Sequence, residues 1–194
     1  MRYLIEKNVQ NKKMWKSVFP EYAVKQAFHE ADLQRGDEYI ITAMQSDLLT
    51  RCLFSMLKSA LIHCVFKKRK FINERDIEVG KALCIFPSKP APPNAGNLLD
   101  PNEFYHIVLE HIELCVNHIS KNMTGFVLEK EYKISQDTIM KLQSGIEACI
   151  RGFVQKLANS TQGTVSFRQF ETVMGTVLGD SSYVNFDHGY VAVS

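Results

Sequence analysis

Residues 41–86 read ITAMQSDLLTRCLFSMLKSALIHCVFKKRKFINERDIEVGKALCIF. The part before the charged cluster, residues 41–66, contains no Gly or Pro, and its apolar residues surround almost the whole circumference of a helix. A helix that is apolar nearly all round is buried on several sides at once. The pattern therefore predicts a long central helix that other helices must cover.

A basic loop and a short helix follow the long helix. The cluster KKRK at residues 67–70 ends it, and the apolar pair Phe71 and Ile72 leads to Asn73. Asn73 is a favourable N-cap, and Asp76 stands three residues further on, as in a capping box. We therefore expect a second helix from residue 73 to about residue 86.

The same order of elements returns later in the chain. A short helix ending near residue 33 precedes the long one, and the proline-rich PSKPAPPNAGNLLDP at residues 87–101 cannot continue a helix. Beyond it, apolar spacing predicts a helix with one face from Phe104 to Ile119, a long helix capped by Ser135 and a short helix capped by Ser166. Each half thus reads as short, long and short helices. The chain divides into a short basic N-terminal segment (1–17), a first helical unit (18–86), a semi-rigid linker (87–101), a second helical unit (102–178) and a tail (179–194).

Charge and cysteine content narrow the classes of function. Residues 1–89 carry 16 basic and 10 acidic side chains and residues 90–194 carry 7 and 11, so their formal charges are +6 and −4. A basic half favours a polyanionic partner. The five cysteines form no CxxC motif, which indicates reduced thiols of an intracellular protein and no metal site. Membrane-spanning runs, a signal peptide and catalytic motifs are missing from the sequence, so we expect no enzyme, no cofactor, no membrane partner and no small-molecule substrate.

This order of helices resembles the histone fold, whose three helices need a partner fold to cover the long central one. KKRKFINERDIEVGKAL looks like the second loop and third helix of a core histone, and Arg69 and Asp76 match the positions where many core histones close that loop with an Arg–Asp pair. The short first helix, the turn after it and the closing leucine-rich stretch of this half look most like core histone 2B. The second half resembles histone 2A more loosely, through TVSFRQFETVM, and has Gln162 and Gln169 at the places of that pair. Two fused folds resemble the histone doublets of giant DNA viruses of the marseillevirus group. The resemblance implies an all-α fold of two tandem histone folds that form an intramolecular pseudodimer.

The resemblance also implies a function. Such a doublet would wrap double-stranded DNA without sequence preference in a nucleosome-like particle, with a histone 4–3-like doublet or histones 3 and 4 as partner. It would package a viral genome in the virion and act in the host nucleus or viral factory. In a histone pair the first loop of each fold lies beside the second loop of the other, so we expect many cations at one end of the pair and few at the other. The expected DNA-binding residues are Lys12, Lys13, Lys16, Arg35, Lys67, Lys68, Arg69, Lys70, Lys121, Lys130, Lys133 and Arg168.

Plainer interpretations stand beside these. Residues 67–70 are also consistent with a solvated helix end, where cations interact favourably with the negative end of the helix dipole. Arg69 and Asp76 are also consistent with an ordinary surface ion pair. The tail, 179–194, would either dock on a neighbouring histone pair or be disordered. An acidic docking patch like that of histone 2A would include Glu110, Glu113 and Glu147. The alternative is that these acidic residues are scattered and solvated.

Three rival classes of function stay open. A histone-fold module of a transcription complex would dock proteins more than it wraps DNA, and the low net charge and lack of long basic tails favour it. A histone pseudodimer can also serve as a regulatory or membrane-surface module, as at the N-terminus of the Ras exchange factor Son of sevenless. The third rival is an unrelated helical structural protein.

Overall fold

The computed structural model describes residues 19–36 and 38–178, except the side chains of residues 46, 47 and 178. This part of the chain is mostly helical, which confirms the all-α class. Before the proline-rich segment the elements are α2 (Glu21–Glu30), β1 (Gln34–Arg35), α3 (Tyr39–Ala43), η1 (Met44–Leu49), α4 (Thr50–Phe66), β2 (Phe71–Ile72) and α5 (Glu74–Ala82). After it they are α6 (Pro101–Asn122), β3 (Lys133–Ile134), α7 (Gln136–Ser160), β4 (Thr164–Val165) and α8 (Phe167–Leu178).

The long helix predicted from residues 41–66 is present and buried. α3, η1 and α4 follow one another without a break, and α4 packs against α5, α6 and α7. One feature differs from the expected uniform helix, because η1 is a π-helical segment. Its wider turn lets the Thr50 hydroxyl donate to the Gln45 carbonyl, 3.0 Å away and five residues earlier. Apolar spacing alone does not predict such a turn.

The predicted helix caps are confirmed. Asn73 and Asp76 form a reciprocal capping box at the start of α5, and Ser135 accepts from the Thr138 N–H at the start of α7. Ser166 accepts from the Gln169 N–H, and the Gln169 side chain accepts from the Ser166 N–H in return. These contacts are local in the sequence, which is why spacing alone predicts them.

Two helix lengths differ from expectation. α5 ends at Ala82 instead of near residue 86, because the chain turns there and Phe86 is buried in the core. α6 has 22 residues and is not a short helix. Its start is fixed by Asp100, which accepts from the N–H groups of Asn102 and Glu103, with Pro101 in the first turn.

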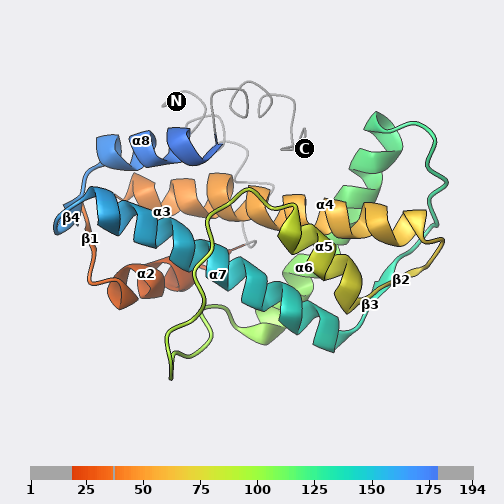
Figure 1. Ribbon diagram of the computed structural model, residues 1–194, viewed down its shortest axis with the longest axis horizontal. Coiled ribbons are helices and arrows are strands. Elements are labelled where there is room, and N and C mark those ends of the chain that lie inside the picture. Colours follow the sequence, from red (N-terminus) through yellow and green to blue (C-terminus); the bar gives the residue numbers. More distant parts are fainter. Residues whose placement is uncertain (1–18, 37, 179–194) are drawn as a thin grey trace.

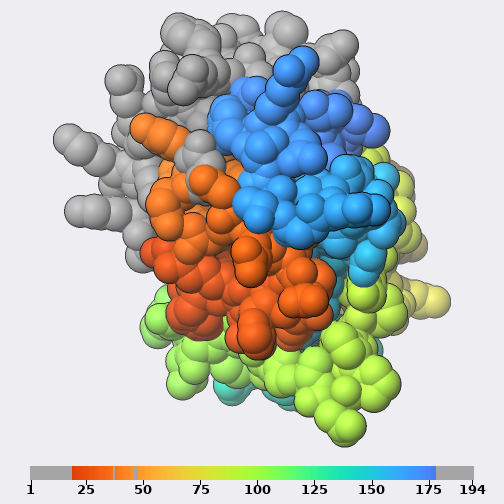
Figure 2. Space-filling model, turned by 90° about the vertical axis from the view of Figure 1, so that its left-hand side faces the viewer, coloured from red at the N-terminus to blue at the C-terminus, as the bar shows by residue number. Residues whose placement is uncertain are grey.

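The two halves meet at both ends of the molecule through short parallel strand pairs. β1 pairs with β4, Gln34 opposite Thr164, and β2 pairs with β3, Phe71 opposite Lys133. These pairs lie at opposite ends of the bundle (Figure 1). Figure 2 looks at the β1–β4 end, where the first half (orange) and the end of the second (blue) lie side by side. The loop before each long helix is therefore joined to the loop after the other one.

One hydrophobic core serves both halves, and it includes buried residues from α2 to α8. The proline-rich segment also contributes to it, since Leu98 and Leu99 are buried. Figure 1 shows this segment crossing over α7, where the Lys89 N–H donates to the Ala148 carbonyl at 2.9 Å. Among the described residues, no helix combines the length and apolarity needed to cross a membrane.

Candidate nucleic-acid interface

The loop after α4 and the loop before α7 lie together at the β2–β3 end. The Lys133 N–H donates to the Lys70 carbonyl at 2.9 Å, so residues 67–70 and 130–133 are neighbours in space. Lys68 takes a left-handed backbone conformation (φ 55°), which turns the chain sharply out of α4. Lys121 lies in the last turn of α6, whose C-terminus begins the connection to β3. We call the end that bears these cations the basic end, and its cations are Lys67, Lys68, Arg69, Lys70, Lys121, Lys130 and Lys133.

Not all of these cations are equally available to an anion. Lys70 pairs with Glu129 at 3.2 Å, and the guanidinium of Arg69 is taken up by Asp76. Lys67, Lys68, Lys130 and Lys133 are exposed, and no ion pair involves them within the described residues. Lys121 is likewise exposed and has no ion pair among the described residues, so five unpaired lysines are the cations best placed to meet a phosphate.

Arg69 and Asp76 form the predicted pair, and the pair is not an ordinary surface contact. Arg69 Nη1 and Nη2 donate to the two oxygens of Asp76 at 2.8 and 2.7 Å, and Asp76 is fully buried. His63, whose role the sequence did not indicate, lies 2.6 Å from the same carboxylate through Nδ1. Burial opposes ionisation of Asp76, but hydrogen bonds from Arg69, the Asn73 N–H and His63 outweigh it and lower the pKa of the carboxyl. The pair ties the basic loop to the first turn of α5.

The geometry also shows how Arg69, one of the expected DNA-binding residues, is held. Arg69 donates to both oxygens of Asp76 and to the Phe71 carbonyl, so its side chain is committed to holding the loop. A guanidinium fixed in this way shapes the basic end.

The opposite end carries fewer cations, as expected. Arg35 pairs with Glu38 there, while Lys156 and Arg168 are exposed. Lys12, Lys13 and Lys16 lie outside the described residues, as does the tail. The distribution of described cations between the two ends is thus uneven.

The basic end also exposes large apolar side chains. Phe66, Phe71 and Val127 are 76%, 62% and 91% exposed, on α4, on β2 and in the loop after α6. Phosphate groups gain nothing from such side chains, whereas a protein surface does. The basic end therefore combines cations, which can bind phosphate, with exposed apolar side chains, which can contact a protein surface.

The acidic docking patch is contradicted at one of its three positions. Glu110 and Glu113 are exposed on α6, but Glu147 is 5% exposed and faces the interior. Its carboxylate accepts from the Leu99 N–H at 2.9 Å and lies 3.7 Å from Arg151. Glu147 thus serves internal packing of the proline-rich segment on α7, and it cannot belong to a docking surface.

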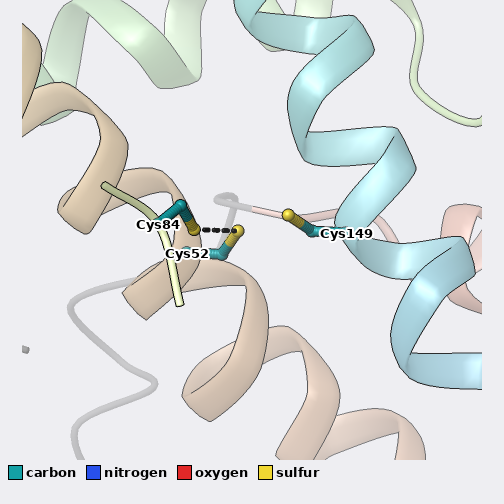
Figure 3. Close-up of side chains that lie close together, drawn as sticks. All are labelled: Cys52, Cys84 and Cys149. Carbon is teal, nitrogen blue, oxygen red and sulfur yellow. Dashed lines mark hydrogen bonds between the residues drawn. The ribbon is translucent and has the colours of Figure 1, made fainter. Parts of the chain in front are cut away.

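The structure also brings together three cysteines that sequence spacing does not group. Cys52 lies on α4, Cys84 just beyond α5 and Cys149 on α7, and their sulfur atoms all lie within 4.8 Å of one another. Figure 3 shows the three side chains pointing toward a common centre, with Cys149 coming from the second half. No CxxC motif marks this group, because its members come together only through the packing of helices from both halves.

Comparison of the sequence with protein-family models gives no match, and comparison with curated proteins gives none either.

Proposed function

We propose that the chain is a pair of histone folds fused in one polypeptide, and that its basic end binds the phosphate backbone of double-stranded DNA without sequence preference. The observation that carries the proposal is the reciprocal pairing of β1 with β4 and of β2 with β3. Two helix–loop–helix–loop–helix units whose loops pair in this way have the arrangement expected of two histone folds. The long α6 is a departure from that pattern.

Charge supports the choice of a nucleic acid as ligand. Lys67 and Lys68 on one loop and Lys130 and Lys133 on the other place four exposed, unpaired cations within one small region. Contacts of lysine with phosphate fix a protein on DNA but read no sequence. DNA wrapping with a histone 4–3-like partner, for packaging of a viral genome, is the wider function that we propose for such a pair.

Salt dependence of DNA binding tests the proposal. We compare the full-length protein with a basic-end variant, Lys67→Gln/Lys68→Gln/Lys133→Gln, and with a matched variant at the opposite end, Lys156→Gln/Arg168→Gln. Each lost phosphate contact lowers the slope of log K against log salt by about 0.9. The basic-end variant is therefore expected to reduce the magnitude of this slope by about 2.7. The opposite-end variant removes one expected DNA-binding residue, Arg168, and is expected to reduce it by about 0.9 at most. Equal slopes for all three proteins would refute the assignment of the DNA contact.

A second experiment tests wrapping itself. DNA assembled with this protein and a histone 4–3 partner is digested with micrococcal nuclease. A discrete protected fragment that disappears when either protein is omitted supports a nucleosome-like particle. Digestion to the same products as naked DNA would refute wrapping.

The protein-docking module is the second candidate, and the exposed apolar residues of the basic end favour it. Phe66, Phe71 and Val127 are exposed on the elements and loops that also carry the cations that we assign to DNA. If the protein instead docks other proteins, its affinity for DNA is weak, and the basic-end variant and the opposite-end variant lower that affinity by equal amounts. The salt slopes therefore distinguish the two candidates.

A further inference from the structure

We propose that Cys52, Cys84 and Cys149 bind a thiophilic d10 cation, Zn²⁺ or Cu⁺, which links the two halves of the chain. Cys52 and Cys84 belong to the first half and Cys149 to the second, so an ion held by all three would bridge α4, the segment after α5 and α7. The inference does not depend on DNA binding.

Distances between the sulfur atoms fit a shared ion. Cys52 Sγ and Cys84 Sγ are 3.9 Å apart, and all three sulfurs lie within 4.8 Å of one another. Two thiolates bound to one zinc at about 2.3 Å are roughly 3.8 Å apart at a tetrahedral angle. Cys52 and Cys84 therefore already have the spacing of bound ligands, and the sulfur of Cys149 lies within 4.8 Å of both.

The chemistry of the group favours soft cations. Thiolate ligands select Zn²⁺ and Cu⁺ over Mg²⁺, Ca²⁺ and Mn²⁺, which prefer oxygen. No other protein ligand is needed for a trigonal Cu⁺ site, and a tetrahedral Zn²⁺ site would keep one position for water or an added ligand. Binding releases the protons of the thiols that are still protonated, so affinity falls with decreasing pH.

The surroundings of the cysteines favour a thiolate at only one of the three positions, Cys84. Hydrogen bonds from Cys149, Cys52 and the Phe86 N–H lower the pKa of Cys84, whereas burial raises the pKa of Cys52. The hydrogen bond with Cys52 and the nearby Lys81 lower the pKa of Cys149, but the hydrogen bond with Cys84 and burial outweigh them and raise it to about 12. Two of the three thiols therefore lose their protons only when an ion binds, and the proposal depends on the distances between the sulfur atoms.

An entry path exists for the ion. Cys84 and Cys149 line a cavity of about 470 Å³ between the end of α5, the proline-rich segment and α7, and Met56 and Lys81 line it too. Cys52 is fully buried behind them. An ion from solvent therefore meets Cys84 and Cys149 first and Cys52 last.

Close backbone packing holds the three positions. A Cβ on Gly80 would clash with the Met56 carbonyl oxygen. Gly80 lies one helical turn before Cys84, and Met56 lies one turn after Cys52. A Cβ on Gly152 would lie 2.5 Å from the Pro87 carbonyl oxygen, one turn from Cys149. Both contacts are with backbone atoms, so the helices and the segment that carry the cysteines cannot easily shift against one another. Metal sites require such rigid support of their ligands.

Zinc and copper binding by the full-length protein tests the inference. The protein, reduced with a thiol-free phosphine, is titrated with Zn²⁺ against a chromophoric chelator and separately with Cu⁺. We expect one tightly bound ion per chain. Loss of a ligand in Cys149→Ser or Cys84→Ala should weaken binding by more than about 100-fold, since changes outside the ligand set already cost about 10–100-fold.

The control is Cys115→Ser, which alters a fully buried cysteine on α6 that lies outside the cluster. It is expected to keep wild-type affinity, and circular dichroism shows whether each variant is folded. Cys84 is only half-buried, so Cys84→Ala provides a ligand variant with less risk to the core. The inference is overturned if folded, reduced wild-type protein retains neither ion, or if Cys84→Ala and Cys115→Ser bind the ion equally well.

Discussion

Replacing Asp76 with Ala removes the carboxylate that joins the basic loop to α5. The fully buried side chain accepts from Arg69 twice and from the Asn73 N–H, and it lies 2.6 Å from His63 Nδ1. Breaking a fully buried ion pair costs about 3–5 kcal/mol, and an exposed pair is worth about 0–1 kcal/mol. The Arg69 side chain is 31% exposed, which places the pair between these limits.

The lost helix cap adds to this cost. Removal of a capping side chain costs about 1 kcal/mol, and a pair of intermediate exposure contributes about 2 kcal/mol. We therefore expect Asp76→Ala to lower the free energy of unfolding by about 3 kcal/mol. Urea denaturation followed by circular dichroism measures it, with Glu78→Ala, an exposed change on the same helix, as the control.

Two outcomes would contradict this reasoning. The first is a loss for Asp76→Ala no larger than that for Glu78→Ala, which should stay within about 0.5 kcal/mol. The second is a double-mutant cycle of Arg69→Ala and Asp76→Ala with a coupling energy below about 0.5 kcal/mol. The pKa of Asp76 is lowered, so its contribution is present at neutral pH and is lost as pH falls below the ordinary value of 3.8.

Three further predictions concern the core. Gly80→Ala should cost about 2 kcal/mol in urea denaturation because its Cβ meets backbone, whereas Gly96→Ala, whose Cβ meets nothing within 4 Å, should cost nothing. Burial lowers the pKa of His111 to about 4, so the unfolded chain binds a proton between pH 6.5 and 4 that the folded protein does not bind. The free energy of unfolding should therefore decrease by up to about 1.4 kcal/mol for each pH unit as the pH is lowered through this range. The His111→Leu variant should lack this decrease. Arg151→Ala should cost about 3–5 kcal/mol by leaving its carboxylate partners without a cation, and thermal unfolding of the exposed Lys156→Ala variant should match wild type.

The sequence predicts contacts between residues that are close together in the chain, but it does not predict the contacts between the two halves. The capping residues Asn73, Ser135 and Ser166 bond to groups three residues away, so their spacing predicts them. Apolar residues around residues 41–66 predict a helix covered on several sides, although not by which helices. The arrangement of those covering helices decides where the cysteines and the basic loops meet.

The polar stripe on α7 shows why the remaining contacts escape sequence analysis. Gln143, Glu147 and Arg151 recur at a spacing of four residues beside the apolar face, and such a stripe ordinarily faces solvent. In this protein it faces the proline-rich segment. Gln143 donates to the Leu99 carbonyl, Glu147 accepts from the Leu99 N–H, and Arg151 donates to the Gly96 carbonyl.

The proline-rich segment therefore has a structural role beyond that of a tether. Prolines prevent it from forming a helix, so its backbone groups need partners from elsewhere. The stripe on α7 supplies them, and Arg151 also donates to Glu30 of α2 at 2.8 Å. One side chain of the second half thereby binds both the connection and the first half. Because the tether keeps the halves together and is itself part of their interface, pairing in this chain does not depend on protein concentration.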